Sequence, residues 1–110
     1  MAELTLAVRN PSGLHARPAA EFVRLAASFA ADVRLANVSR DAGAWADAKS
    51  ILDVLSLGVS AGNEIRVRAE GPDAEHALQA LSELVASELG ESGGPILAAD
   101  TVRDVGRSEV

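Results

Sequence analysis

The chain has 110 residues, of which 48% are hydrophobic and 3% aromatic, with a formal net charge of −6. This length fits one modest domain with a single core. It contains no cysteine, which excludes disulfide scaffolds, cysteine zinc sites and thiol catalysis. The acidic balance argues against nucleic acid as the main partner. The net charge is uneven, +1 over residues 1–50 and −7 over residues 51–110.

The N-terminus reads MAELTLAVRNPSG, without a basic start followed by an apolar run, so it does not resemble a signal peptide. No apolar run approaches the roughly 20 residues that a membrane-spanning helix needs. We therefore expect a cytoplasmic protein without membrane insertion. The sequence also predicts no metal site and no cofactor.

The first half of the chain alternates between two periodicities. Glu3 to Arg9 alternates apolar and polar residues, which predicts a half-buried strand. Residues 10–13 read as a turn. From Ala16 to about Ala30 the apolar residues recur at helical spacing. Residues 32–38 alternate again, as in a second strand, and a loop over 39–44 leads to a short strand over 44–48.

Ser50 opens the second half as the N-cap of a helix, because Asp53 follows three residues later in a pattern close to a capping box. The segment 51–57 is apolar nearly all round, so it is either deeply buried or offers one apolar face to a partner. A strand is predicted over 65–70. A third helix follows from Asp73 to about Leu89, with His76 on its polar side as a surface residue.

The predicted order of elements is β-α-β-β-α-β-α. Helices and strands mix without a steady βαβ repeat, which favours an α+β domain with helices on one face of an antiparallel sheet. We place this domain at residues 1–90. Residues 91–110 begin with the linker-like ESGGP and are interpreted as a C-terminal tail.

One short motif, GLHARP, combines residue types suited to a phosphate. His15 stands just before a predicted helix, whose first N–H groups lack internal partners and carry partial positive charge. Arg17 adds a forked cation, Pro18 fits the first turn, and Gly13 permits positive φ or close backbone approach. A neutral imidazole is a nucleophile that can carry a phosphoryl group. On residue types alone, however, a single histidine before a helix is more often a capping or surface residue than a catalytic one.

Three stretches in the same order resemble HPr, the histidine-containing phosphocarrier of the bacterial phosphotransferase system. They are GLHARPAAEFVRLAASF, then AKSILDVLSLGV, then AEGPDAEHALQAL followed by LGE. The resemblance extends from about Leu4 to Glu91. It implies an open-faced β-sandwich, with four antiparallel strands covered on one face by three helices.

The resemblance also implies a function. His15 would accept a phosphoryl group from Enzyme I, charged by phosphoenolpyruvate, and donate it to the IIA domain of a sugar permease. Such a carrier is used stoichiometrically and is hardly an enzyme in the strict sense. Arg17 would contact the phosphate, supported by Gly13, Ala16 and Pro18. We expect the protein to act as a monomer.

By the same resemblance, Ser50 matches a regulatory serine modified by HPr kinase/phosphorylase, and a transcriptional regulator could read that modification. Ser50 is a good N-cap whether or not anything phosphorylates it. The partner-binding surface would comprise Ala20, Arg24, Lys49, Ile51, Leu52 and Leu55. The alternative for the apolar residues among them is that they belong to the core.

The sequence departs from the family pattern in three places. The stretch between His15 and Ser50 is a few residues longer than usual, with the excess in the loop NVSRDAGAW. Asp53 puts a carboxylate where a small residue is common. The tail extends past a free-standing HPr, which raises the possibility of a domain from a fused multiphosphoryl transfer protein.

Two other classes of function compete with a phosphocarrier. A regulatory binding module acting through Ser50 and the second helix would be expected to lack the phosphorylatable histidine, which is present here. A purely structural α+β domain would leave the GLHARP motif without a purpose.

Overall fold

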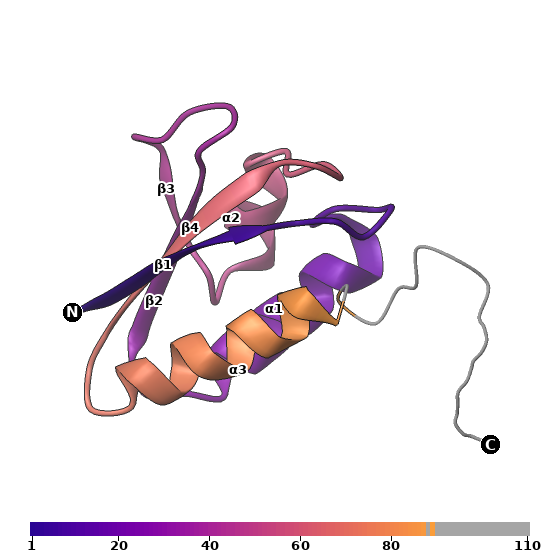
Figure 1. Ribbon diagram of the computed structural model, residues 1–110. Helices are drawn as coiled ribbons and strands as arrows, with labels where there is room; N and C mark the ends of the chain where they lie inside the picture. Colours follow the sequence, from indigo (N-terminus) through magenta and orange to yellow (C-terminus); the bar gives the residue numbers. More distant parts are fainter. Residues whose placement is uncertain (88, 90–110) are drawn as a thin grey trace, which may run out of the picture.

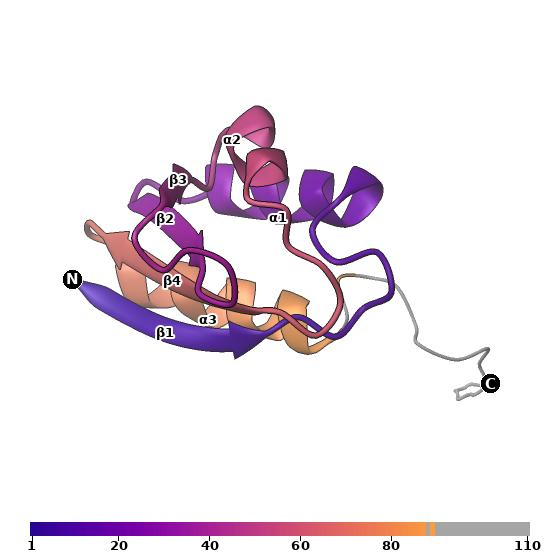
Figure 2. The ribbon, with the colours of Figure 1, turned by 90° about the horizontal axis from the view of Figure 1, so that it is seen from above.

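The computed structural model describes residues 1–87 and 89 of the chain. Its elements are β1 (Ala2–Ala7), α1 (Ala16–Ala27), β2 (Asp32–Asn37), β3 (Trp45–Asp47), α2 (Ile51–Ser56), β4 (Glu64–Glu70) and α3 (Ala74–Ala86). The four strands form one antiparallel sheet in the order β1-β4-β2-β3. The three helices cover one face of this sheet (Figures 1 and 2). The predicted α+β open-faced sandwich is confirmed.

Strand alternation places the core between the sheet and the helices. On the central strand β4, Ile65, Val67 and Ala69 are fully buried, whereas the residues between them point to the open face. Val33 and Leu35 of β2 pair with Ala69 and Val67 in register and are buried too. β4 thus hides one face only, as its sequence pattern predicts, whereas Leu35, Ala36 and Asn37 at the end of β2 are all buried.

The open face of the sheet is polar. The Arg68 guanidinium lies over the Trp45 ring, 4.1 Å from its centroid, in a cation–π contact that covers the one tryptophan of the chain. Arg66 Nε lies 3.3 Å from a carboxylate oxygen of Glu3 on the neighbouring strand. This face contrasts with the apolar face under the helices.

Each helix contributes one apolar stripe to the core. In α1 the buried residues include Ala19, Phe22 and Ala26, spaced three and four apart. The buried residues of α3 are Ala74, Ala77, Leu78, Leu81 and Val85. These stripes match the helical periodicity of the sequence. Among the described residues, no helix combines the length and the apolar character that crossing a membrane requires.

The first helix is shorter than predicted, because it ends at Ala27 and not near Ala30. The Asp73 carboxylate accepts hydrogen bonds from the backbone N–H groups of Ala30, at 2.9 Å, and Ala31, at 2.8 Å. These two donors are thereby satisfied outside any helix. The assigned α3 likewise ends at Ala86, before the predicted Leu89. The tail predicted over 91–110 lies outside the described residues.

Two hydrogen bonds fix how α1 and α2 lie together. Lys49 Nζ, just before α2, donates to the carbonyl of Phe29 just after α1, at 2.8 Å. At the opposite end, Leu14 N donates to the carbonyl of Val59 at 3.0 Å. Because the start of each helix adjoins the end of the other, α1 and α2 run side by side in opposite directions (Figure 2).

Candidate functional site

His15 is the N-cap residue of α1, as the sequence predicted. Its backbone is extended, with φ −127° and ψ 160°, and its side chain makes no capping hydrogen bond. The residue is exposed. The imidazole is therefore available to another molecule, at the end of the helix where the backbone dipoles place partial positive charge.

The turn before His15 depends on Gly13. Gly13 has φ +59°, and a Cβ there would lie 2.8 Å from the Ser60 Cα and against the Val59 carbonyl. Asn10, which is fully buried, donates from Nδ2 to the carbonyl of Gly13 at 2.9 Å. Both uses of glycine predicted for this position are present: positive φ and close backbone approach.

Ala16, directly after His15, has φ +50°. This left-handed conformation is unfavourable for an L-residue with a side chain. Pro18 is buried in the first turn, where its missing N–H removes no intrahelical bond. The strain at Ala16 could not be predicted from the sequence, because alanine normally favours the right-handed helix.

Arg17 lies two residues after His15 and is exposed. Among the ion pairs formed by the described residues, none includes Arg17. A guanidinium in this setting keeps its donors for an incoming anion. His15, the start of α1 and Arg17 together form a site that could hold a phosphoryl group on the imidazole.

Ser50 caps α2 through its side chain. Its hydroxyl oxygen accepts from Asp53 N at 3.3 Å, whereas Ser50 N donates to the Asp47 carbonyl at 3.1 Å. Only the serine half of the predicted capping box is therefore formed. Ser50 remains half-exposed, so the cap leaves part of the residue at the surface.

The second helix, α2, packs beside α1 and carries exposed apolar side chains. Leu52 is 75% exposed and Ile51 38% exposed, whereas Val54 is fully buried. Leu55 is half-buried and packs against the core. The second helix is thus neither wholly core nor wholly surface. We call the group of Ala20, Arg24, Ile51, Leu52 and Leu55 the helical face.

The two cations predicted for partner binding both have intramolecular partners. Arg24 Nη1 lies 3.1 Å from a carboxylate oxygen of Glu21, one turn earlier. Lys49 Nζ donates to the Phe29 carbonyl. The structure gives Lys49 a role in joining α1 to α2, and its part in binding a partner stays a prediction.

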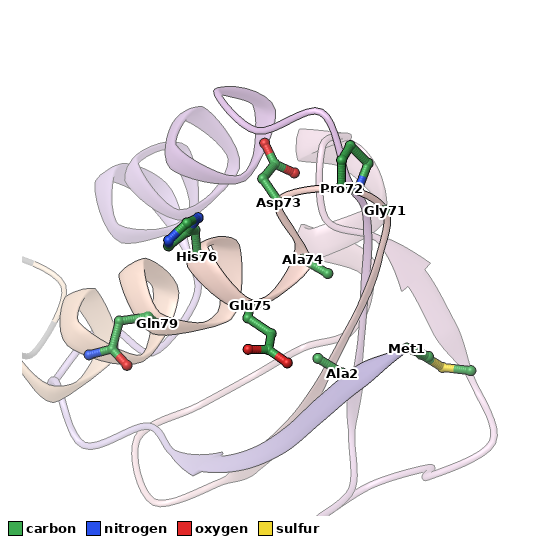
Figure 3. Close-up of a pocket in the computed structure, with 9 residues that line it drawn as sticks. All are labelled: Met1, Ala2, Gly71, Pro72, Asp73, Ala74, Glu75, His76 and Gln79. Atoms are coloured by element: carbon green, nitrogen blue, oxygen red, sulfur yellow. The ribbon is translucent and has the colours of Figure 1, made fainter.

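One hollow on the described surface, of about 570 Å³, lies away from these residues (Figure 3). It is formed at the start of α3 and the start of β1. Its lining includes Asp73, Glu75 and His76, together with Met1 and Ala2. None of the predicted site residues borders it, and His76 is exposed as expected for a surface residue.

Comparison with known proteins decides the family. A family model described as the PTS HPr component phosphorylation site matches residues 2–87. The chain belongs to the HPr family. A solved structure of HPr from Thermoanaerobacter tengcongensis is 42% identical, with a TM-score of 0.77, and the match covers 84% of this chain and 99% of that one.

Two kinds of curated relative are similar to this HPr-family chain. The phosphocarrier protein HPr of Haloferax volcanii is 44% identical over 85 residues, which cover 77% of this chain and 93% of the relative. The multiphosphoryl transfer protein of Vibrio cholerae is also 44% identical, over 87 residues that cover 79% of this chain. The match spans 22% of that longer relative.

Proposed function

We propose that this protein carries a phosphoryl group on His15, accepting it from phosphorylated Enzyme I and donating it to a IIA domain. HPr proteins work with Enzyme I and IIA components of the phosphotransferase system. The observation that carries the proposal is an exposed histidine at the N-terminus of α1, two residues before an arginine outside any ion pair of the described residues.

Each transfer is one nucleophilic displacement. A ring nitrogen of neutral His15 attacks the phosphorus of the donor, and the N–P bond forms as the bond to the donor breaks. In the second transfer, a nucleophilic group of the IIA domain attacks the same phosphorus, and the N–P bond breaks with the neutral imidazole as the leaving group. Arg17 and the first N–H groups of α1 balance the negative charge of the phosphoryl oxygens, supported by the turn at Gly13, Ala16 and Pro18.

Partners are proposed to dock on the helical face, because Leu52 and Ile51 of α2 present exposed apolar surface there. Burying Leu52 and Ile51 would exclude water and align the acceptor with the phosphohistidine. Within this proposal the carrier acts as a cytoplasmic monomer, visited by each partner in turn.

Ser50 suggests a second, regulatory use of the same surface. A phosphate on Ser50 would add negative charge directly beside the exposed apolar residues of α2. It would then oppose one partner and could recruit another, such as a transcriptional regulator. The modifying enzyme would be HPr kinase/phosphorylase.

The similarity to multiphosphoryl transfer proteins supports one further form of the proposal, in which this sequence acts as the HPr domain of a fused protein. Its chemistry at His15 would be unchanged. The difference would lie in whether donor and acceptor domains share one chain with it.

The test is phosphorylation by Enzyme I with labelled phosphoenolpyruvate. Acid-labile label should appear on the chain and be absent from His15→Ala. The matched control is His76→Ala, which removes the other histidine and should be labelled normally. Label persisting in His15→Ala, or none in the unaltered chain with a competent Enzyme I, contradicts the proposal.

A further inference from the structure

One carboxylate on the exposed side of α2 has no hydrogen-bond or ion-pair partner among the described residues. Asp53 lies in the first turn of α2 and is exposed, next to the protruding Leu52. Its backbone N–H donates to Ser50 Oγ, and its carbonyl accepts from Ser56 Oγ at 2.6 Å. Within residues 1–87 and 89, its carboxylate takes part in no hydrogen bond or ion pair.

The neighbouring cations do not neutralise this carboxylate. Arg24 is paired with Glu21, on its own helix. The Lys49 ammonium donates to the Phe29 carbonyl, at the end of α1. The α2 side of the helical face therefore combines exposed apolar surface with one carboxylate that no cationic side chain of the described residues pairs with.

The opposite end of the same surface is positive. His15 stands at the start of α1, with the positive end of the helix dipole and the Arg17 guanidinium. Because α1 and α2 are antiparallel, Asp53 at the start of α2 lies toward the far end of α1, which is about 18 Å long at 1.5 Å per residue. A protein that covers both His15 and Leu52 spans both charges.

We infer that the surface running from His15 and Arg17 across the helical face to Asp53 carries opposite charges at its two ends. The protein that exchanges a phosphoryl group with His15 presents a lysine or arginine to Asp53, beside an apolar recess for Leu52. This inference rests on the proposed function. Opposite charges at the two ends would orient the partner on the carrier, and a partner with an acidic side chain at the Asp53 end would be rejected.

The experiment measures KM and kcat for phosphorylation of the chain by Enzyme I, with Asp53→Asn and Asp53→Lys. We expect KM to rise about threefold for Asp53→Asn and about tenfold for Asp53→Lys, as for an exposed charge pair that is removed or reversed. The kcat value should stay unchanged. The differences should vanish near about 0.5 M salt, where exposed charges are screened.

Glu75→Gln and Glu75→Lys are the matched controls. Glu75 is also exposed and lies in the first turn of its helix, α3. The same change of charge is therefore made at the positive end of a helix dipole in both pairs of variants. It lies beside Ala2 of β1 (Figure 3), in a hollow to which no residue of α2 contributes. These variants should keep the KM of the unaltered chain.

An unchanged or lower KM for Asp53→Lys, with the unaltered chain labelled normally, overturns the inference alone. An equal rise for Glu75→Lys overturns it as well, because the effect would then follow net charge. Failure to label the unaltered chain overturns the proposed function, and the inference falls with it. Thermal unfolding by circular dichroism separates any variant that has lost its fold.

Discussion

The backbone N–H of Leu14 donates to the carbonyl of Val59 at 3.0 Å, which ties the residue before His15 to the loop after α2. Leu14 itself is fully buried. The position of the histidine is thus set jointly by the turn that precedes it and by a segment more than forty residues away. Substitutions in this region test how far the site depends on that fit.

Gly13→Ala should destabilise the protein and impair phosphorylation of His15. The added Cβ meets the backbone of Val59 and Ser60, at a φ of +59° that alanine disfavours. We expect a loss of about 2 kcal/mol in the free energy of unfolding, measured by denaturant titration. Gly62→Ala is the control, since it also has positive φ but nothing within 4 Å of the added Cβ. Equal losses in the two variants would show that the close approach contributes nothing.

Ala16→Gly should raise stability by about 1 kcal/mol, because glycine adopts φ +50° without the steric conflict that alanine meets there. Ala20→Gly, on the exposed side of the same helix, should instead lower stability by about 1 kcal/mol. Chemical denaturation measures both. A loss of stability in Ala16→Gly would indicate that the left-handed conformation is not strained.

Arg17→Ala should slow phosphoryl transfer from Enzyme I by roughly tenfold to a hundredfold, the effect of removing a charge-assisted hydrogen bond to the phosphoryl group. The unfolding free energy should hardly change, since the residue is exposed. Arg34→Ala, on the open face of the sheet, is the control. Transfer at the unaltered rate would remove Arg17 from the site.

Ser50→Ala should cost about 1 kcal/mol of stability, because the hydroxyl that accepts from Asp53 N is lost. Ser50→Asn retains a capping acceptor and should recover most of it. Neither variant can be phosphorylated at this position. A difference in stability between them therefore reports the capping hydrogen bond and not the modification. If Ser50→Asn were as unstable as Ser50→Ala, the cap would not explain the loss.

Asp73 should make stability depend on acid pH. The hydrogen bond from Ala30 N, followed by that from Ala31 N, lowers the pKa of this carboxyl below its ordinary 3.8 against the opposing effect of burial. The stabilisation is therefore present above the ordinary pKa and lost as pH falls below 3.8 through the folded value. Asp73→Asn should remove this part of the loss of stability in acid, measured as the dependence of Tm on pH in thermal unfolding.

The order of the elements could be predicted because each strand and helix has a clear apolar period. Val33 and Leu35 alternate, whereas Ala19, Phe22 and Ala26 recur at helical spacing. These local patterns suffice for burial, and the structure confirms them. The position of His15 just before a helix also followed from its neighbours, Gly13 in the turn and Pro18 in the first helical turn.

Features that depend on distant partners could not be predicted. Asp73 has the residue type of an N-cap, yet its carboxylate bonds to Ala30 and Ala31. Lys49 has the residue type of a surface cation, yet its ammonium joins α1 to α2. In both cases the local sequence suggests one role and the tertiary arrangement supplies another partner.

The strand order also has a kinetic consequence. β4 lies between β1 and β2, so one of the two inner strands of the sheet is the last strand to be synthesised. β1 pairs with it across a separation of more than fifty residues. The two strands therefore cannot pair until Glu64–Glu70 has left the ribosome, and such distant pairings slow folding. Until then the edges of β1 and β2 that pair with β4 keep unpaired backbone N–H and C=O groups, and such strand edges make an incomplete chain prone to aggregate.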